Sequence, residues 1–184
     1  MQPRDAWAAA FAVCDPQGPF SGPLSAFPGV PRAKTPFVIV DIDGTVANSD
    51  ARMSLHPKNR PGYPSGRAWD EFYAAAKDDP SHPEIVALAL ALAVRFPLFF
   101  LTGRREEDRA ATRAWLEAHD LPVTRLLMRP RGDRRPDFTV KAEMLAALRG
   151  EGFEPLFAIE DRAQVAAMFR AAGVRVLHVA EGNY

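Results

Sequence analysis

Two aspartates, Asp41 and Asp43, stand directly after an apolar run in the stretch FVIVDIDGT (37–45). The run is typical of a strand buried in a core, and carboxylates at its end can attack phosphorus or transfer protons. Further polar residues follow later apolar runs: Thr102, Gly103 and Arg104, then Lys141, then Glu160 and Asp161. The sequence therefore offers acids, a hydroxyl and cations near the ends of several predicted strands.

Five apolar runs alternate with helix-like stretches from residue 37 onward. The expected strands are residues 37–41, 97–101, 126–128, 156–159 and 175–179. Most are continuous apolar runs, as strands covered on both faces require. The alternation predicts an α/β fold with a five-stranded parallel sheet. Because ligands bind beyond the carboxyl ends of such strands, the polar residues are expected to meet at one edge.

Proline and glycine mark the expected helices and loops between the strands. Pro83 suits the first position of a helix, and another helix is expected over residues 104–119. Gly150 and Gly173 are expected at the C-terminal ends of two later helices. The polar stretch SLHPKNRPGYPSG (54–66) is expected to be a loop beside the site and a small lid.

Four acids are expected at the polar edge of the sheet: Asp41, Asp43, Glu160 and Asp161. Two unit charges about 4 Å apart repel by roughly 4 kcal/mol at an effective dielectric of about 20, so these acids require a cation. Oxygen ligands with no histidine or thiolate nearby favour Mg²⁺, which often shares its coordination shell with a substrate phosphate. We therefore expect the four acids to bind Mg²⁺ and the substrate to be a phosphate ester.

The same residues cover each need of phosphoryl transfer. Asp41 would attack phosphorus and form an aspartyl-phosphate, while Asp43 would protonate the departing oxygen and then activate water. Thr102 and Lys141 would hold phosphate oxygens, and Glu160 with Asp161 would anchor the metal.

Four short motifs, in this order, resemble those of the haloacid dehalogenase superfamily of phosphohydrolases: DIDGT (41–45), LTGR (101–104), Lys141 and IEDR (159–162). The resemblance spans residues 37 to about 179. It implies a three-layer Rossmann-like fold with a minimal cap, with Asp41 as the nucleophile and Asp43 as the general acid and base.

The residues around these motifs resemble the phosphatase domain of phage-type polynucleotide kinase-phosphatases, which remove 3′-phosphates from nucleic-acid ends and nucleotides. Arg52, nine residues after Asp43, carries part of this resemblance. Four segments carry the rest: WDEFYAAAKDDP, LTGRREEDRAATRAWL, LLMRPRGDRRPDFTVK and EDRAQVAAMFRAAGV. It implies that Arg52, Gly103, Arg104 and Asp137 bind the substrate, and a planar guanidinium is well suited to grip a phosphate.

Two features depart from the phage-type pattern. Glu160 stands where that family usually has the first of two aspartates, and its longer side chain is expected either to shift the metal or to contact it through a water molecule. No GxxxxGK[ST] phosphate loop occurs in the sequence, so any kinase or ligase partner is expected to be a separate chain.

Other residues near the motifs have more than one interpretation. Asp137 is a good N-cap for the helix that follows, and it is also expected to orient Arg52 or Arg104. Lys141 in the first turn of that helix opposes the helix dipole, which favours a functional role.

Two further groups of side chains could contact nucleic acid or be structural. Four clustered arginines either contact a nucleic-acid backbone or belong to a solvated loop: Arg129, Arg131, Arg134 and Arg135. Three aromatic residues either stack on a base or, as their helical spacing favours, pack in the core: Trp69, Phe72 and Tyr73.

Composition indicates one globular domain. The 184 residues are 47% hydrophobic, and we expect a Pro-rich extension over residues 1–36 and a phosphatase domain over 37–184. A net charge of zero argues against indiscriminate coating of nucleic acid. The single cysteine, Cys14, excludes an intrachain disulfide, and no apolar run approaches the roughly 20 residues that span a bilayer. We expect a cytoplasmic protein.

The leading hypothesis is a Mg²⁺-dependent phosphatase that removes 3′-phosphates from polynucleotide ends or nucleotides. The alternative is a small-molecule phosphatase for 5′-nucleotides or sugar phosphates. A receiver-type signalling module is disfavoured because LLMRP, at the third strand, offers no acid to accept a phosphoryl group. A catalytically silent binding module would become the leading interpretation if metal-stimulated phosphatase activity were absent.

Overall fold

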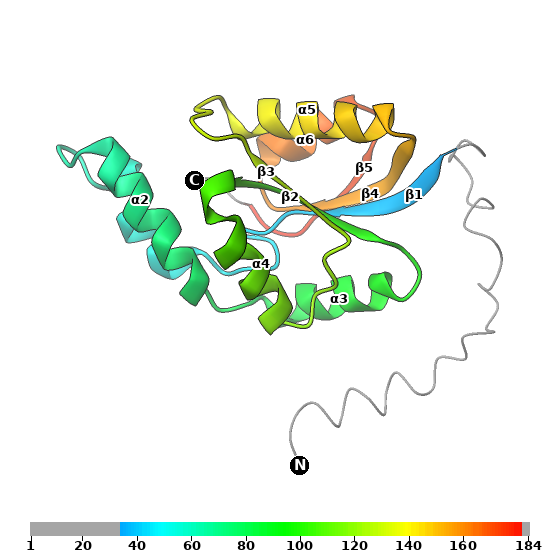
Figure 1. Cartoon of the computed structure of the whole chain (residues 1–184), viewed down its shortest axis with the longest axis horizontal. Coiled ribbons are helices and arrows are strands. Elements are labelled where there is room, and N and C mark those ends of the chain that lie inside the picture. The colour runs from blue at the N-terminus through cyan, green and yellow to red at the C-terminus, as the bar shows by residue number, and fades with distance from the viewer. Residues whose placement is uncertain (1–33, 182–184) are drawn as a thin grey trace, which may run out of the picture.

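A computed structural model describes residues 34–181 of the chain. These residues form a five-stranded, all-parallel sheet with the strand order β3-β2-β1-β4-β5 (Figure 1). The strands are β1 (Thr35–Val40), β2 (Leu98–Arg105), β3 (Arg125–Arg129), β4 (Phe153–Glu160) and β5 (Arg175–His178). The predicted α/β fold with five parallel strands is confirmed.

Helices cover both faces of the sheet. Figure 1 shows α5 (Asp137–Gly150) and α6 (Ala163–Ala171) on one face, with α3 (Pro83–Ala93) and α4 (Arg109–Ala118) on the other. A fifth helix, α2 (Ser65–Ala75), lies at one end of the sheet (Figure 1). Short 3₁₀ segments complete the described part: η2 (Asp50–Leu55), η3 (Pro57–Asn59), η4 (Ala76–Asp78) and η5 (Glu106–Asp108).

The central strand β1 contributes to a hydrophobic core on each side of the sheet. Val38 and Val40 belong to the core beneath α3 and α4, whereas Phe37 and Ile39 belong to the core beneath α5 and α6. All four side chains are at most 1% exposed. A strand covered on both faces must be apolar throughout, which explains why the apolar run stops only at the aspartates.

The second strand is longer than the sequence predicted, and the following helix starts later. β2 continues to Arg105, which pairs with Arg129 of β3 after a shift in register. The expected helix over 104–119 therefore begins at Arg109, as α4. Polar residues at the end of β2 look like a turn in the sequence, but they remain in the sheet.

The glycine predictions are partly confirmed. Gly173, with φ of 80°, follows α6 as expected of a glycine that ends a helix. Gly150 is the last residue of α5 itself, and the left-handed position after that helix belongs to Gly152, with φ of 89°. Gly152 is the residue that the turn requires, because L side chains rarely adopt such a φ.

The segment expected to be a loop, residues 54–66, contains parts of η2 and α2 together with all of η3. Its role as a lid stays a prediction. The expected extension, residues 1–36, lies outside the described residues apart from its last three, and Cys14 is among the residues not described. β1 begins at Thr35. Within residues 34–181, no helix has the length and apolar character needed to cross a bilayer.

Candidate active site

Asp41 is the first residue beyond β1, and its backbone N–H donates a hydrogen bond to the carbonyl of Ile159 at 3.0 Å. This bond fixes Asp41 between the ends of β1 and β4. The side chain is buried, and its Oδ1 accepts a hydrogen bond from Nζ of Lys141 at 2.6 Å. The hydroxyl of Thr45 donates to Oδ2 of Asp41 at 3.3 Å. Sequence reasoning quoted Thr45 within a motif but gave it no role.

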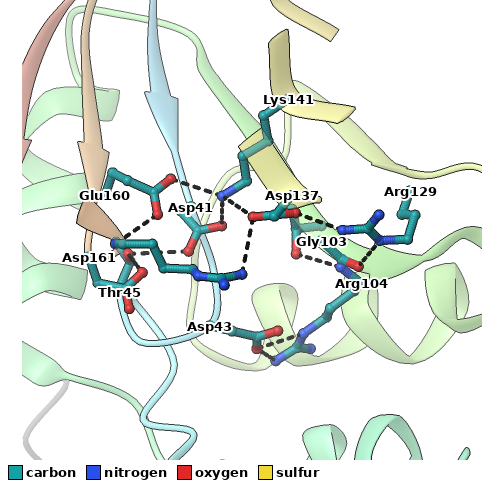
Figure 2. Close-up of polar contacts among 12 residues, drawn as sticks. Asp41, Asp43, Thr45, Gly103, Arg104, Arg129, Asp137, Lys141, Glu160 and Asp161 are labelled. Atoms are coloured by element: carbon teal, nitrogen blue, oxygen red, sulfur yellow. Dashed lines mark hydrogen bonds and ion pairs between the residues drawn. The ribbon is translucent and has the colours of Figure 1, made fainter. Parts of the chain in front are cut away.

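Glu160 and Asp161 lie at the end of the neighbouring strand β4, and both are fully buried. Glu160 uses both oxygens: Oε2 accepts from Nζ of Lys141 at 2.8 Å and Oε1 from the backbone N–H of Arg162 at 3.1 Å. One carboxylate oxygen from each of Asp41, Glu160 and Asp161 lies within 4.8 Å of the others. The predicted convergence of acids from two strands is therefore found in the structure (Figure 2).

The electrostatics of this cluster favour a bound cation. Burial, with the charge of Glu160 second, raises the pKa of Asp41 to about 7, although Lys141 opposes the shift. Burial likewise raises the pKa of Glu160 to about 7 against the opposing effect of Lys141. Burial lowers the pKa of Lys141, but the charges of Asp137, Asp41 and Glu160 raise it well above its ordinary value. Lys141 is one buried ammonium among several buried carboxylates, and a hard divalent ion suits such oxygen donors.

Asp43 is placed differently from the other acids. Its Oδ1 accepts hydrogen bonds from Arg104, at 2.9 Å from Nε and 2.6 Å from Nη2, and from Nη2 of Arg52 at 2.5 Å. Burial alone would raise the pKa of Asp43, but Arg104 and Arg52 outweigh it and lower the pKa. The two arginines thus hold Asp43 as a carboxylate, and it is not part of the three-acid cluster that could hold a metal.

Asp79 completes the arginine arrangement, and sequence reasoning missed it. Both of its oxygens accept from Nε of Arg52, at 3.1 and 2.8 Å, and Oδ2 lies 3.5 Å from Nη2 of Arg104. Asp79 is 6% exposed and follows η4 directly. In the sequence it precedes Pro80 and looks like a turn residue, and nothing in the segment WDEFYAAAKDDP singles it out as a partner of the arginines.

Asp137 is the first residue of α5 rather than its N-cap, which is Pro136. Its carboxylate lies 3.0 Å from Nη2 of Arg129, 3.3 Å from Nζ of Lys141 and 3.7 Å from Nη1 of Arg162 (Figure 2). The expectation that Asp137 orients Arg52 or Arg104 was therefore wrong. Instead, Asp137 links the acid cluster to Arg129, one of the four clustered arginines.

Lys141 lies one turn into α5, not in its first turn, and its ammonium reaches back to the acids of β1 and β4. Thr102 is buried within β2, and its Oγ1 accepts a hydrogen bond from the backbone N–H of Arg104 at 3.1 Å. The roles predicted for these two side chains on the substrate phosphate stay predictions.

A cavity of about 560 Å³ opens over Asp41 and Asp43. Gly103 lines it, as do residues of α2 and of the segment between β3 and α5. Arg52 and Arg104 do not line it, because their side chains, 2% exposed, are turned to Asp43 and Asp79. Their predicted contact with the substrate stays a prediction.

Residues 35–184 match the family model described as the polynucleotide kinase PNKP phosphatase domain. The chain belongs to this family. The resemblance to haloacid dehalogenase-type phosphatases is thereby confirmed, and the chain carries the phosphatase fold of that superfamily. Phosphatases of this type generally use a divalent metal, and the cluster of Asp41, Glu160 and Asp161 could bind one.

Solved structures show the same fold in other members of the superfamily. The chain aligns with a structure titled "Structure of Pnkp1/Rnl/Hen1 complex" at a TM-score of 0.67 and 22% identity, covering 84% of this chain and 49% of that one. The class C acid phosphatase from Bacillus anthracis aligns at 0.60 and 15% identity, covering 82% and 68%. A haloacid dehalogenase-like hydrolase from Streptococcus pneumoniae aligns at 0.53 and 15% identity, covering 79% and 84%. The chain thus spans about half the length of its Pnkp1 complex match.

Proposed function

We propose that this PNKP-type phosphatase domain is a Mg²⁺-dependent enzyme that removes 3′-phosphates from polynucleotide ends or nucleotides. The observation that carries the proposal is the position of Asp41. It is a buried carboxylate at the floor of a 560 Å³ cavity, next to Glu160 and Asp161 and 2.6 Å from the ammonium of Lys141. The match to the PNKP phosphatase family supports the choice of a 3′-phosphorylated substrate.

Asp41, Glu160 and Asp161 are the residues that would hold the metal. When bound, the ion neutralises the clustered acids and the negative charge of the phosphoryl oxygens. Asp43, which the sequence suggested as a fourth ligand, lies outside this three-acid cluster, and its contacts with Arg52 and Arg104 fit proton transfer better than ligation.

In the proposed reaction Asp41 attacks phosphorus as a carboxylate, which forms an aspartyl-phosphate and breaks the bond between phosphorus and the 3′-oxygen. Asp43 gives a proton to that leaving oxygen. In the second step Asp43 accepts a proton from water, which displaces Asp41 from phosphorus and releases inorganic phosphate.

The resting arrangement favours the second of these roles for Asp43, because the two arginines stabilise its charged form. Donation of a proton therefore requires Arg52 and Arg104 to weaken their hold when a phosphate enters. A guanidinium turned from a carboxylate to a phosphate keeps a bidentate partner, so the exchange is chemically reasonable.

The experiment that tests this function compares matched oligonucleotides, DNA and RNA, that carry a 3′- or a 5′-phosphate, with Mg²⁺ or with chelator. The expected result is metal-dependent release of phosphate from the 3′ end only, and loss of that release in Asp41→Asn. Equal or better turnover of a sugar phosphate would contradict the substrate and support a small-molecule phosphatase. A cytoplasmic location and a separate kinase or ligase partner stay predictions.

A further inference from the structure

The cavity over Asp41 has two chemically different walls. Helix α2 supplies an aromatic wall through Trp69, Phe72 and Tyr73. The segment between β3 and α5 supplies a cationic wall, which includes Arg134 and Arg135. Figure 1 shows α2 and the loop that leads into α5 at the same end of the sheet. Aromatic faces beside cations are what single-stranded nucleic acid binds, because every base has a π-face and every linkage a negative charge.

The aromatic wall is held rigidly from behind. Trp69 and Tyr73 are stacked, with ring centroids 5.5 Å apart and an interplanar angle of 20°. Phe72 meets Trp69 edge to face at 5.7 Å, and Arg52 lies over the Phe72 ring at 4.1 Å. The hydroxyl of Tyr73 donates to the carbonyl of Gly103 at 3.3 Å, which ties α2 to the end of β2. The rings are therefore positioned before any substrate arrives.

Within this wall, Trp69 is the ring best suited to receive a ligand. Phe72 is only 5% exposed and packs beneath the arginines. Tyr73 is covered by the guanidinium of Arg105, which lies 4.7 Å from its ring centroid. Trp69 is partly exposed and lines the cavity beside His56, whose ring it meets edge to face at 4.8 Å. Its indole also has the largest stacking surface of the three side chains.

The arginines near the cationic wall differ in whether they form ion pairs with carboxylates. Arg135 is paired with Asp133 and Glu143, and Arg129 is paired with Asp137. Within residues 34–181, Arg134 makes no ion pair, so its charge is available to a phosphodiester. A cavity of about 560 Å³ has room for one nucleotide between the two walls.

We propose that Trp69 stacks on the nucleobase at the reacting 3′ end, so that the site takes an unpaired terminal nucleotide. The inference rests on the proposed function, because it places the 3′-phosphate at Asp41 and the attached base on α2. A cavity with room for one nucleotide does not admit a base together with its pairing partner, so a paired terminal base must first leave its partner to reach Trp69. The site is thereby selective for single-stranded or frayed ends.

The test uses single-stranded oligonucleotides with a 3′-phosphate on either a thymidine or an abasic tetrahydrofuran residue. Wild type is expected to show a kcat/KM about tenfold higher on the thymidine end, the size of effect that one base–aromatic stack gives. Trp69→Ala is expected to lose this preference through a higher KM on thymidine, with a clearly smaller loss of kcat/KM on the abasic end, where only the packing of Trp69 on Tyr73 is removed. Trp69→Phe is expected to keep most of the preference for the thymidine end, because phenylalanine can still stack on a base.

Pairing the thymidine end in a blunt duplex is expected to lower the kcat/KM of the wild type. The kcat/KM of Trp69→Ala is expected to change little on the same substrate. Tyr63→Ala is the matched control, since Tyr63 is an aromatic residue of the same region that does not line the cavity. It is expected to keep the base preference.

Two results would overturn the stacking role: wild type without a base preference, or equal losses on both ends in Trp69→Ala, which would indicate packing alone. A wild-type protein that released no 3′-phosphate from either end would instead overturn the proposed function, and the stacking role with it.

Discussion

A Cβ atom on Gly103 would lie 2.5 Å from Oδ1 of Asp137, so only glycine lets the end of β2 approach the start of α5 this closely. Asp137 cannot easily move away, because Arg129 and Lys141 hold its carboxylate. The glycine of the LTGR motif thus serves the site by leaving room for a carboxylate that contacts Lys141.

Gly103→Ala is expected to displace Asp137 and, with it, the ammonium of Lys141. Overpacking of this kind costs about 1–3 kcal/mol of stability. Misplacement of reacting groups by about 1 Å lowers turnover roughly 100-fold, so the loss of activity is expected to exceed the loss of stability. Gly150→Ala is the control, because a Cβ there meets nothing within 4 Å. Wild-type kinetics in Gly103→Ala would refute the packing argument.

Removal of the ammonium in Lys141→Met is expected to be strongly destabilising. Asp41 and Glu160 would both lose a buried partner, at 2.6 and 2.8 Å, and breaking a buried ion pair costs about 3–5 kcal/mol. Lys34→Met removes a lysine that pairs with Glu154 at 2.9 Å but is 32% exposed, and it is expected to cost about 1 kcal/mol or less. Urea unfolding of both variants measures the difference, and equal losses would contradict it.

The Arg52→Ala substitution is expected to lower both the turnover rate and the melting temperature. The change removes the hydrogen bonds from Nε of Arg52 to both carboxylate oxygens of Asp79. It also leaves Arg104 as the remaining arginine partner of the two that contact Asp43. Arg60→Ala is a control on the same side of the molecule, since Arg60 pairs with the half-exposed Glu71. Wild-type turnover in Arg52→Ala would show that Arg104 alone suffices to hold Asp43.

Shortening Glu160 to the more usual aspartate, in Glu160→Asp, is expected to weaken metal binding rather than improve it. Both oxygens of Glu160 are in use, on Lys141 and on the backbone N–H of Arg162, and a shorter side chain cannot reach both. Mg²⁺ at a hundredfold excess over its Kd would stabilise the wild type by about 2.7 kcal/mol. The measurement is the melting temperature with increasing Mg²⁺, and a larger shift in Glu160→Asp would contradict the expectation.

The sequence predicted the sheet well because buried parallel strands are apolar throughout and therefore easy to find. β1 and β4 both end close to where their apolar runs stop. It predicted the end of β2 less well, because the pairing of Arg105 with Arg129 continues the strand beyond the apolar run. Polar residues paired within a sheet carry no local signal that separates them from a turn.

The acids and Lys141 could be predicted because each belongs to a motif at a strand end. Asp79 could not, because its role depends on a contact with Arg52, 27 residues earlier in the chain. The distinct place of Asp43 was missed for a similar reason. Its two arginines approach from η2 and from the end of β2, and only the folded chain brings them together.

The most direct test of the account is a rapid acid quench of the wild-type protein with a 3′-[³²P]phosphorylated oligonucleotide and Mg²⁺, followed by mapping of the labelled residue. The account predicts transient label on Asp41 and none in Asp41→Asn. Turnover without label on the protein, or label on a different residue, would contradict the assignment of Asp41 as the nucleophile.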